Sequence, residues 1–189
     1  MLSSPHAAIL PYENKTFTMT WKDTLATAGT QQTLARAHSA LALGTIYKLG
    51  KGGFDPVKPM TAQCDCSGFI AWAIGIPREL PPGSDKWLST DEYWAGGKPV
   101  KAGLFTQILL KDAVAGDLLV YPDSGGSQGH ISIINQVDNN MPTFIIHCSS
   151  GNFKNFNDAI RITSPAVFLS GNHPTRTMRI NYELLKSIK

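Results

Sequence analysis

The chain has 189 residues, of which 42% are hydrophobic and 16% charged, a composition typical of a globular protein and not of a disordered one. Its net charge of +3 is mildly basic and favours an anionic partner such as cell wall only weakly. Lys and Arg are scattered without a dense basic run, and every apolar stretch falls well short of the roughly 20 residues of a membrane helix. We therefore expect one domain over residues 1–189, without a nucleic-acid or membrane partner.

The N-terminal segment predicts no targeting signal. Residues 1–20 read as an irregular arm whose apolar run, 7–10, is stopped by Pro11, so it is too short for the core of a signal peptide. If the target lies outside the cytoplasm, we expect another route, such as a dedicated secretion machine, cell lysis or a removed leader. Action within the cytoplasm is the alternative.

The first half of the chain predicts helices and loops. Residues 21–49 are expected to be helical, with a helix opening at Gln32 or Thr33 and ending before the glycines at 50, 52 and 53. A loop is predicted at 54–64. Residues 66–74 (CSGFIAWAI) predict a buried helix with Asp65 as its N-cap, 77–86 a loop, and 89–97 a short helix capped by Ser89 or Thr90.

From residue 116 the pattern changes to strands. The runs DLLVY, HISIINQV and TFIIHC are rich in β-branched residues and are separated by the turn sequences PDSGGSQG and DNNMP. IRITSPAVFL and TRTMRINY predict one or two further strands. Helices followed by a strand meander indicate an α+β fold, with N-terminal helices packed on a mostly antiparallel sheet.

Cys66 is the candidate nucleophile. It opens a predicted helix, whose positive N-terminus and free N–H groups are expected to lower a thiol pKa. The residues that follow, Ser67 and Gly68, are small, so a substrate carbonyl can approach backbone N–H groups that act as an oxyanion hole. The simpler interpretation is a small core cysteine.

The other two cysteines, at 64 and 148, are expected not to be catalytic. Two free thiols are the preferred interpretation over a disulfide between them. A zinc site is disfavoured, because Cys64 and Cys66 are too close in sequence for the usual spacing and a second pair is lacking. We therefore expect no metal or other cofactor.

Two histidines are candidates for the base and its partner. His130 begins a predicted strand after a glycine-rich turn, and alternation places it on one face with Ser132. His147 ends the next predicted strand, and two adjacent antiparallel strands can bring the histidines together. A base is usually oriented by such a third polar group. Each histidine alone could be an ordinary surface or backbone-bonded residue.

The ordered set of motifs resembles the NlpC-type cell-wall cysteine peptidases, which are small papain-like enzymes. The resemblance covers about residues 34–152 and leaves the C-terminal extension 153–189 unplaced. It rests on these segments in this order: Tyr47 to Gly53, Asp65-Cys66-Ser67-Gly68-Phe69, Ile76-Pro77-Arg78, Gly116-Asp117-Leu118-Leu119, Gly129-His130-Ile131 and Ile146-His147.

The resemblance implies roles for individual residues. Cys66 corresponds to the nucleophile, His130 to the base and His147 to the orienting third residue. Tyr47 corresponds to a residue lining the acyl-side pocket, and Asp65 to one that in some members binds a free substrate amine. Ser67, next to the nucleophile, is included among the substrate-binding candidates.

The expected activity is hydrolysis of an amide bond in the peptide stem of bacterial peptidoglycan. In the family it resembles, the bond most often joins γ-D-glutamate to a diamino acid. A papain-like acyltransferase or deamidase is a rival enzyme, and an inactive wall-binding module is a rival of another class. The chain is expected to be monomeric. It could serve as an antibacterial toxin, which would imply an inhibitor or immunity protein as partner, or as a lysin.

Overall fold

A computed structural model describes residues 29–53, 63–81 and 83–188. The predicted arm at 1–20 and most of the predicted loop at 54–64 lie outside the described residues. Within them, no helix is both long and apolar enough to cross a membrane.

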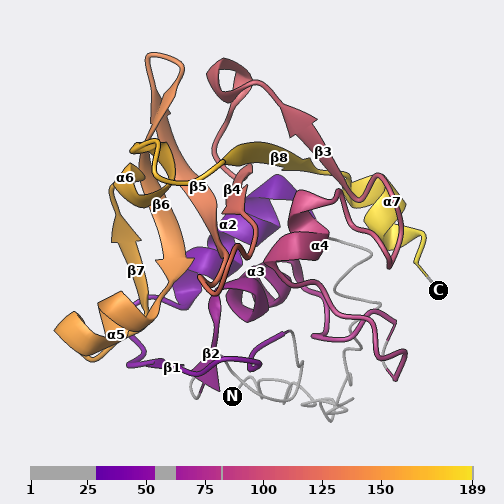
Figure 1. Cartoon of the computed structure of the whole chain (residues 1–189), viewed down its shortest axis with the longest axis horizontal. Helices are drawn as coiled ribbons and strands as arrows, with labels where there is room; N and C mark the ends of the chain where they lie inside the picture. Colours follow the sequence, from indigo (N-terminus) through magenta and orange to yellow (C-terminus); the bar gives the residue numbers. More distant parts are fainter. Residues whose placement is uncertain (1–28, 54–62, 82, 189) are drawn as a thin grey trace, which may run out of the picture.

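A six-stranded antiparallel sheet forms the body of the molecule (Figure 1). Its strand order is β3-β8-β4-β5-β6-β7, and every neighbouring pair is antiparallel. A separate parallel pair joins β1 to β2. The strands are β1 (Ile46–Tyr47), β2 (Gln63–Cys64), β3 (Phe105–Ile108), β4 (Leu118–Tyr121), β5 (His130–Asp138), β6 (Met141–Cys148), β7 (Ile160–Thr163) and β8 (Arg176–Ile180).

Helices α2 (Thr30–Ser39) and α3 (Cys66–Ile74) pack together on one face of this sheet. All residues of α3 are buried, and they share a core with Ile131 and Ile133 of β5. Arg36 of α2 donates to the carbonyl oxygens of Ala73 and Ile74, so it satisfies free acceptors at the end of α3. The predicted α+β fold, with N-terminal helices packed on a mostly antiparallel sheet, is confirmed.

Helix α3 begins and ends where the sequence predicts. Asp65 is the N-cap, and its carboxylate accepts the N–H of Gly68. The helix stops at Gly75, which adopts a left-handed conformation (φ 91°) that glycine tolerates best. The short helix α4 (Thr90–Trp94) likewise has its predicted cap, with Ser89 and Glu92 forming a capping box.

Residues 21–28 of the predicted helix over 21–49 lie outside the described residues, and the prediction is wrong beyond Ser39, where α2 ends. Positive φ angles at Ala42 (60°) and Gly44 (67°) turn the chain out of the helix. The next residues, Ile46 and Tyr47, pair with β2 instead. The apolar run that suggested one long helix therefore forms a helix, a turn and a strand. Hydrophobic periodicity did not predict this, because it carries no information about the pairing of Ile46 and Tyr47 with β2.

The C-terminal segment 153–189, which the resemblance left unplaced, is part of the sheet, and the strands predicted from IRITSPAVFL and TRTMRINY are confirmed as β7 (Ile160–Thr163) and β8 (Arg176–Ile180). β7 lies at one edge beside β6, and β8 lies between β3 and β4. The remaining elements are the 3₁₀ turn η1 (Leu110–Asp112) and the short helices α5 (Ser150–Phe156), α6 (Ala166–Leu169) and α7 (Tyr182–Lys186). Strand β3, η1, α5 and α7 were not predicted, because each is brief and held mainly by tertiary contacts. The strand prediction is wrong for Ala166–Leu169, which form α6.

Candidate active site

Cys66 lies at the N-terminus of α3, with 6% of its surface exposed. Its thiol contacts the start of β5: Sγ is 3.9 Å from the carbonyl oxygen of Gly129, which accepts the thiol hydrogen. Gly129 directly precedes His130. The fold therefore brings the predicted nucleophile beside the strand that carries the predicted base.

The Cys66 thiol is protonated at rest, which differs from the expectation drawn from helix position alone. Burial, followed by the Asp65 carboxylate, raises the pKa of the thiol to about 12. The backbone N–H groups of Ser67 and Ile131 lower the pKa, but only partly offset this rise. The site therefore needs a base that removes the proton while substrate is bound.

The carboxylate of Asp65, the residue before Cys66, accepts several hydrogen bonds in the site. Its two oxygens bind the guanidinium of Arg78 at 2.6 and 2.9 Å, a bidentate pair between side chains 2% and 16% exposed. They also accept the N–H groups of Gly68 at 2.7 Å and Gly50 at 2.6 Å, and the hydroxyl of Ser67 at 3.2 Å. The negative charge of the predicted amine-binding carboxylate is thus already balanced by the guanidinium of Arg78.

Gly68 is required by the close approach of two backbones. A Cβ at this position would overlap the carbonyl oxygen of Lys51 and the guanidinium of Arg78. The glycine in the Asp65-Cys66-Ser67-Gly68 segment therefore allows the turn at residues 50–53 to lie against the first turn of α3.

His130 and His147 form a direct pair. His130 is the first residue of β5, His147 is the penultimate residue of β6, and His130 Nε2 lies 2.7 Å from His147 Nδ1. The ring of His130 stacks on Phe168 with a centroid distance of 5.4 Å and an interplanar angle of 12°. This packing fixes the ring plane, so the second ring nitrogen of His130 has a defined direction.

Hydrogen bonds beyond His147 favour one tautomer of the pair. Thr163 Oγ1 lies 3.0 Å from His147 Nε2, and its own hydroxyl donates to the carbonyl oxygen of Ser164 at 3.2 Å. Thr163 therefore accepts from His147 Nε2–H, and His147 Nδ1 accepts from His130 Nε2–H. This leaves Nδ1 of His130 unprotonated, as a base requires.

Asn152 is the competing neighbour of His147. Its amide nitrogen is 3.3 Å from His147 Nε2, but it also donates to the carbonyl oxygens of Ala159 at 3.2 Å and His147 at 3.4 Å. Its two hydrogens thus have carbonyl acceptors, and His147 Nε2 remains free to donate to Thr163.

Both histidines are neutral at ordinary pH. Burial, followed by the neighbouring His147 and His173, lowers the pKa of His130 to about 3. Burial lowers the pKa of His147 to about 4. Together with the protonated thiol of Cys66, the two histidines form a neutral set.

Two adjoining depressions open at the site. One is lined by Cys66 and by the predicted substrate-binding residues Asp65 and Ser67; the other is lined by His130 and His147. Tyr47, Gln128 and Gly129 line both depressions. The structure thus brings all six predicted site residues into one region, with Tyr47 at the boundary between the nucleophile and the histidines.

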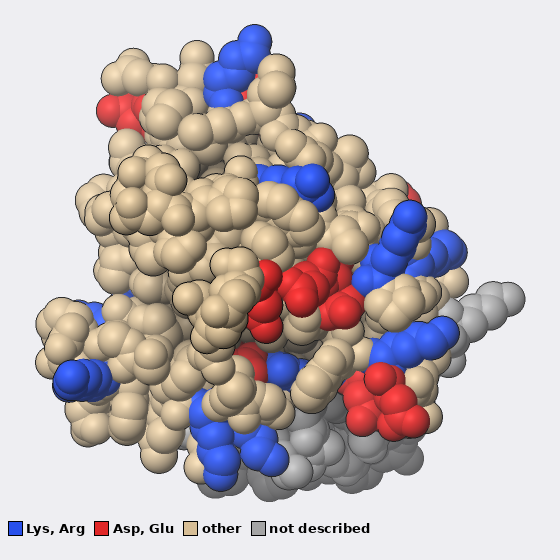
Figure 2. Space-filling model, in the orientation of Figure 1, with Lys and Arg blue, Asp and Glu red and all other residues tan. Residues whose placement is uncertain are grey.

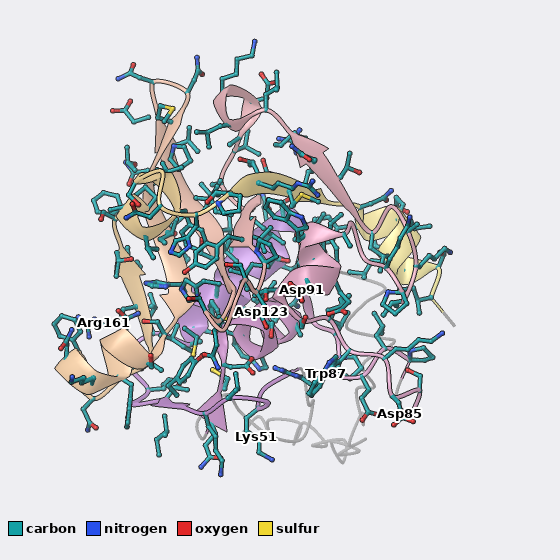
Figure 3. The ribbon with its side chains drawn as sticks, in the orientation of Figure 1. Lys51, Asp85, Trp87, Asp91, Asp123 and Arg161 are labelled. Atoms are coloured by element: carbon teal, nitrogen blue, oxygen red, sulfur yellow. The ribbon has the colours of Figure 1, made fainter. Side chains whose placement is uncertain are left out.

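The rim on the nucleophile side is acidic. Acidic side chains gather at the centre of one face in Figure 2, where Figure 3 labels Asp91 and Asp123. Asp91 accepts the backbone N–H of Asp123 at 2.9 Å, and Asp123 lines the depression together with Trp87. The negative charge of this patch contrasts with the positive net charge of the whole chain.

Several residues of the site were not found from the sequence. Arg78 was noted only as part of the Pro-Arg segment, and Asn152 lies at the end of the segment that the resemblance covers but matches none of its motifs. Thr163 and Phe168 lie in the extension that the resemblance does not cover. An isolated threonine or asparagine carries no sequence signal for contact with a histidine. Only the pairing of β6 with β7 places Thr163 beside His147.

Comparisons with known proteins give a distant structural likeness. No protein-family model matches the chain, and no curated protein matches its sequence. Among solved structures, one match is a protein from Staphylococcus aureus subsp. aureus Mu50, described as similar to a lipoprotein of the NLP/P60 family. It is 20% identical, with a TM-score of 0.47, over 78% of this chain and 40% of the other. The chain thus spans less than half the length of that protein, and its function has to be argued from its own residues.

Proposed function

We propose that the chain is a cysteine peptidase or amidase of the NlpC type, acting on the peptide stem of bacterial peptidoglycan. The observation that carries the proposal is the 2.7 Å contact of His130 Nε2 with His147 Nδ1 in a site that also holds Cys66 at a helix N-terminus. A buried nucleophile, a neutral histidine and an orienting third group are the parts that acyl transfer to a thiol requires.

The proposed reaction starts from the neutral set. As the thiol of Cys66 attacks the amide carbonyl, His130 takes its proton through Nδ1, and the resulting imidazolium is stabilised by donation from Nε2 to His147. Backbone N–H groups at the start of α3 stabilise the oxyanion. His130 then protonates the leaving amine, and water hydrolyses the thioester with His130 as base.

The pKa values support proton transfer that is coupled to attack. A thiol pKa near 12 and an imidazole pKa near 3 strongly disfavour a preformed thiolate–imidazolium pair. Substrate binding excludes water and supplies the electrophile, so the proton moves only when a carbonyl is in place. Because the resting thiol is protonated, it also reacts less readily with small electrophiles.

The proposed bond joins γ-D-glutamate to a diamino acid. Tyr47, Asp65 and Ser67 would line the acyl side, as the resemblance implies. Because Asp65 is bound by Arg78, it would contribute to amine recognition only as part of an ion-pair network. The exposed carboxylate of Asp123 at the same rim would add attraction for a cationic amine.

The decisive experiment incubates the purified protein with defined muropeptides and identifies the products by mass spectrometry. Wild type should release two fragments whose masses sum to substrate plus one water, and Cys66→Ala should lower turnover by roughly a thousandfold or more while leaving the circular dichroism unchanged. Cys148→Ala, assayed under reducing conditions, is the matched cysteine control and should retain activity.

Other products would favour other functions. Transfer of the acyl group to an added amine without hydrolysis would indicate an acyltransferase, and release of ammonia a deamidase. Binding to wall without any product would indicate an inactive module. Substantial turnover by Cys66→Ala would contradict the assigned nucleophile.

Specificity is tested with matched stem peptides, one with a free N-terminal amine and one still attached to glycan. We expect a higher kcat/KM for the free amine in wild type and a smaller preference in Asp65→Asn. An equal rate for both substrates, unchanged by Asp65→Asn, would remove Asp65 from recognition without affecting the assignment of Cys66 and His130.

A further inference from the structure

Two cysteines that the proposed reaction does not use lie against each other in the core. Cys64 ends β2 and Cys148 ends β6. They are 84 positions apart in sequence, yet their Sγ atoms are 3.2 Å apart and both side chains are fully buried. A disulfide bond is about 2.05 Å long, so a movement of about 1 Å would close the gap.

We propose that Cys64 and Cys148 are a disulfide site, oxidised when the protein is in an oxidising compartment. In the structure both cysteines are free thiols, as the sequence analysis expects, and the proposal concerns their oxidised form. The cross-link does not rest on the proposed function, because its formation requires only the two thiols. It would nevertheless hold the active site, since Cys64 lies two residues before Cys66 and Cys148 directly follows His147.

The disulfide would stabilise the position of the small β1–β2 sheet. β1 and β2 form a two-residue parallel pair outside the six-stranded sheet, and such short pairings are weak alone. Without the disulfide, Cys64 is held by hydrogen bonds. Its carbonyl oxygen accepts the N–H of Lys48 at 2.9 Å and the thiol of Cys148 at 3.4 Å, and its Sγ lies 3.2 Å from that of Cys148. A disulfide would join this small sheet covalently to β6.

The chemistry is thiol–disulfide exchange with a disulfide donor, such as oxidised glutathione or an oxidised dithiol protein. One cysteine thiolate attacks the donor disulfide and releases one donor thiol. The second cysteine attacks the mixed disulfide and releases the other. The protein loses two protons and two electrons, which together are two hydrogen atoms, and the donor disulfide takes them up to become two thiols.

Burial determines when this exchange can happen. It raises the pKa of Cys148 well above the usual range of a thiol, so the reactive thiolate is rare in the folded state. Exchange should therefore take place during folding, before the pair is buried, or after local opening. A protein folded in the reducing cytosol would carry two thiols until it opens in an oxidising environment.

The test uses the full chain carrying Cys66→Ala, so that the nucleophile cannot enter exchange. The protein is unfolded and refolded with either reduced or oxidised glutathione, alkylated under denaturing conditions, and analysed by intact and peptide mass spectrometry. The reduced sample should take up two alkyl groups. The oxidised sample should take up none, should be lighter by two hydrogens before alkylation, and should yield a peptide containing Cys64 linked to Cys148.

Thermal unfolding provides an independent readout. The oxidised Cys66→Ala protein should melt roughly 4–16 °C above its reduced form, because the cross-link closes a long loop in the unfolded chain. The matched control, Cys66→Ala with Cys148→Ala, should show no such shift between the two conditions.

Two results would overturn the proposal. One is a folded, oxidatively refolded protein in which both thiols still react with the alkylating reagent. The other is a glutathione adduct on either cysteine in place of the internal link. Neither result would bear on the proposed hydrolase activity, which is measured separately with Cys66 present.

Discussion

The sharpest test of the histidine pair is Thr163→Val. The substitution keeps the β-branched shape of the side chain but removes the oxygen that lies 3.0 Å from His147 Nε2. In the catalytic tautomer, Nε2–H would then point at a methyl group. The alternative tautomer places the proton on Nδ1 of His147 and turns the donor toward His130, which then holds its own proton on the nitrogen needed as base.

The magnitude follows from the lost acceptor. A buried donor without a partner costs about 1–3 kcal/mol, and His147 is buried whereas Thr163 is half-buried. If this cost falls on the catalytic tautomer, kcat/KM should decrease by about 5- to 150-fold. Water reaching the half-buried position would move the result toward the lower limit.

The assay compares wild type, Thr163→Val and Thr163→Ser on the same muropeptide. The serine variant retains a hydroxyl and should recover most of the activity. Nitrogen chemical shifts of the two imidazoles report the tautomers directly, and in Thr163→Val the protonated nitrogen of His147 should change from Nε2 to Nδ1. A purely structural role would lower stability without moving this signature. Unchanged tautomers and unchanged kcat/KM in folded Thr163→Val would refute the relay.

Three further predictions concern stability. The histidine pKa values near 3 and 4 lie below the unfolded value of about 6.5, so the unfolded chain binds more protons between these limits, and stability should be full above pH 6.5 and lost as pH falls. His130 and His147 should each contribute a loss of about 2–3 kcal/mol between pH 7 and pH 4, which urea unfolding at several pH values measures, and a flat profile would contradict their neutral burial. Arg78→Met leaves the buried carboxylate of Asp65 without its cation and should lower the free energy of unfolding by about 3–5 kcal/mol; adding Asp65→Asn should restore part of it, and no recovery would mean that the ion pair is not the cause. Gly68→Ala forces a Cβ onto a backbone carbonyl and should cost about 2–3 kcal/mol in the same assay, whereas an unchanged melting temperature would show that the two backbones can separate freely.

Much of the local structure was predictable because its causes are local. The boundaries of α3 follow from a capping aspartate and a terminal glycine, and those of α4 from a capping box. Strands β4, β5 and β6 follow from β-branched runs between turn sequences. Cys66, His130 and His147 were candidates from their places at a helix start and at strand ends, and the resemblance in the order of the motifs singled them out.

What the sequence could not determine depends on contacts between distant segments. The helix expected up to residue 49 stops at Ser39, because Ile46 and Tyr47 find a strand partner in β2. The sequence predicts strands in the tail but not the place of β8 between β3 and β4, because sheet order is decided by pairing and not by chain order.

The chemistry of the site was also decided by tertiary structure. A helix N-terminus alone predicts a lowered thiol pKa, but burial and Asp65 raise the pKa of Cys66. The acceptor for His147 comes from β7, and the partner of Cys64 comes from the end of β6. Sequence patterns identify side chains able to react, whereas burial and long-range pairing set their protonation, their tautomers and their partners, because these depend on the dielectric and the neighbours that only the folded chain provides.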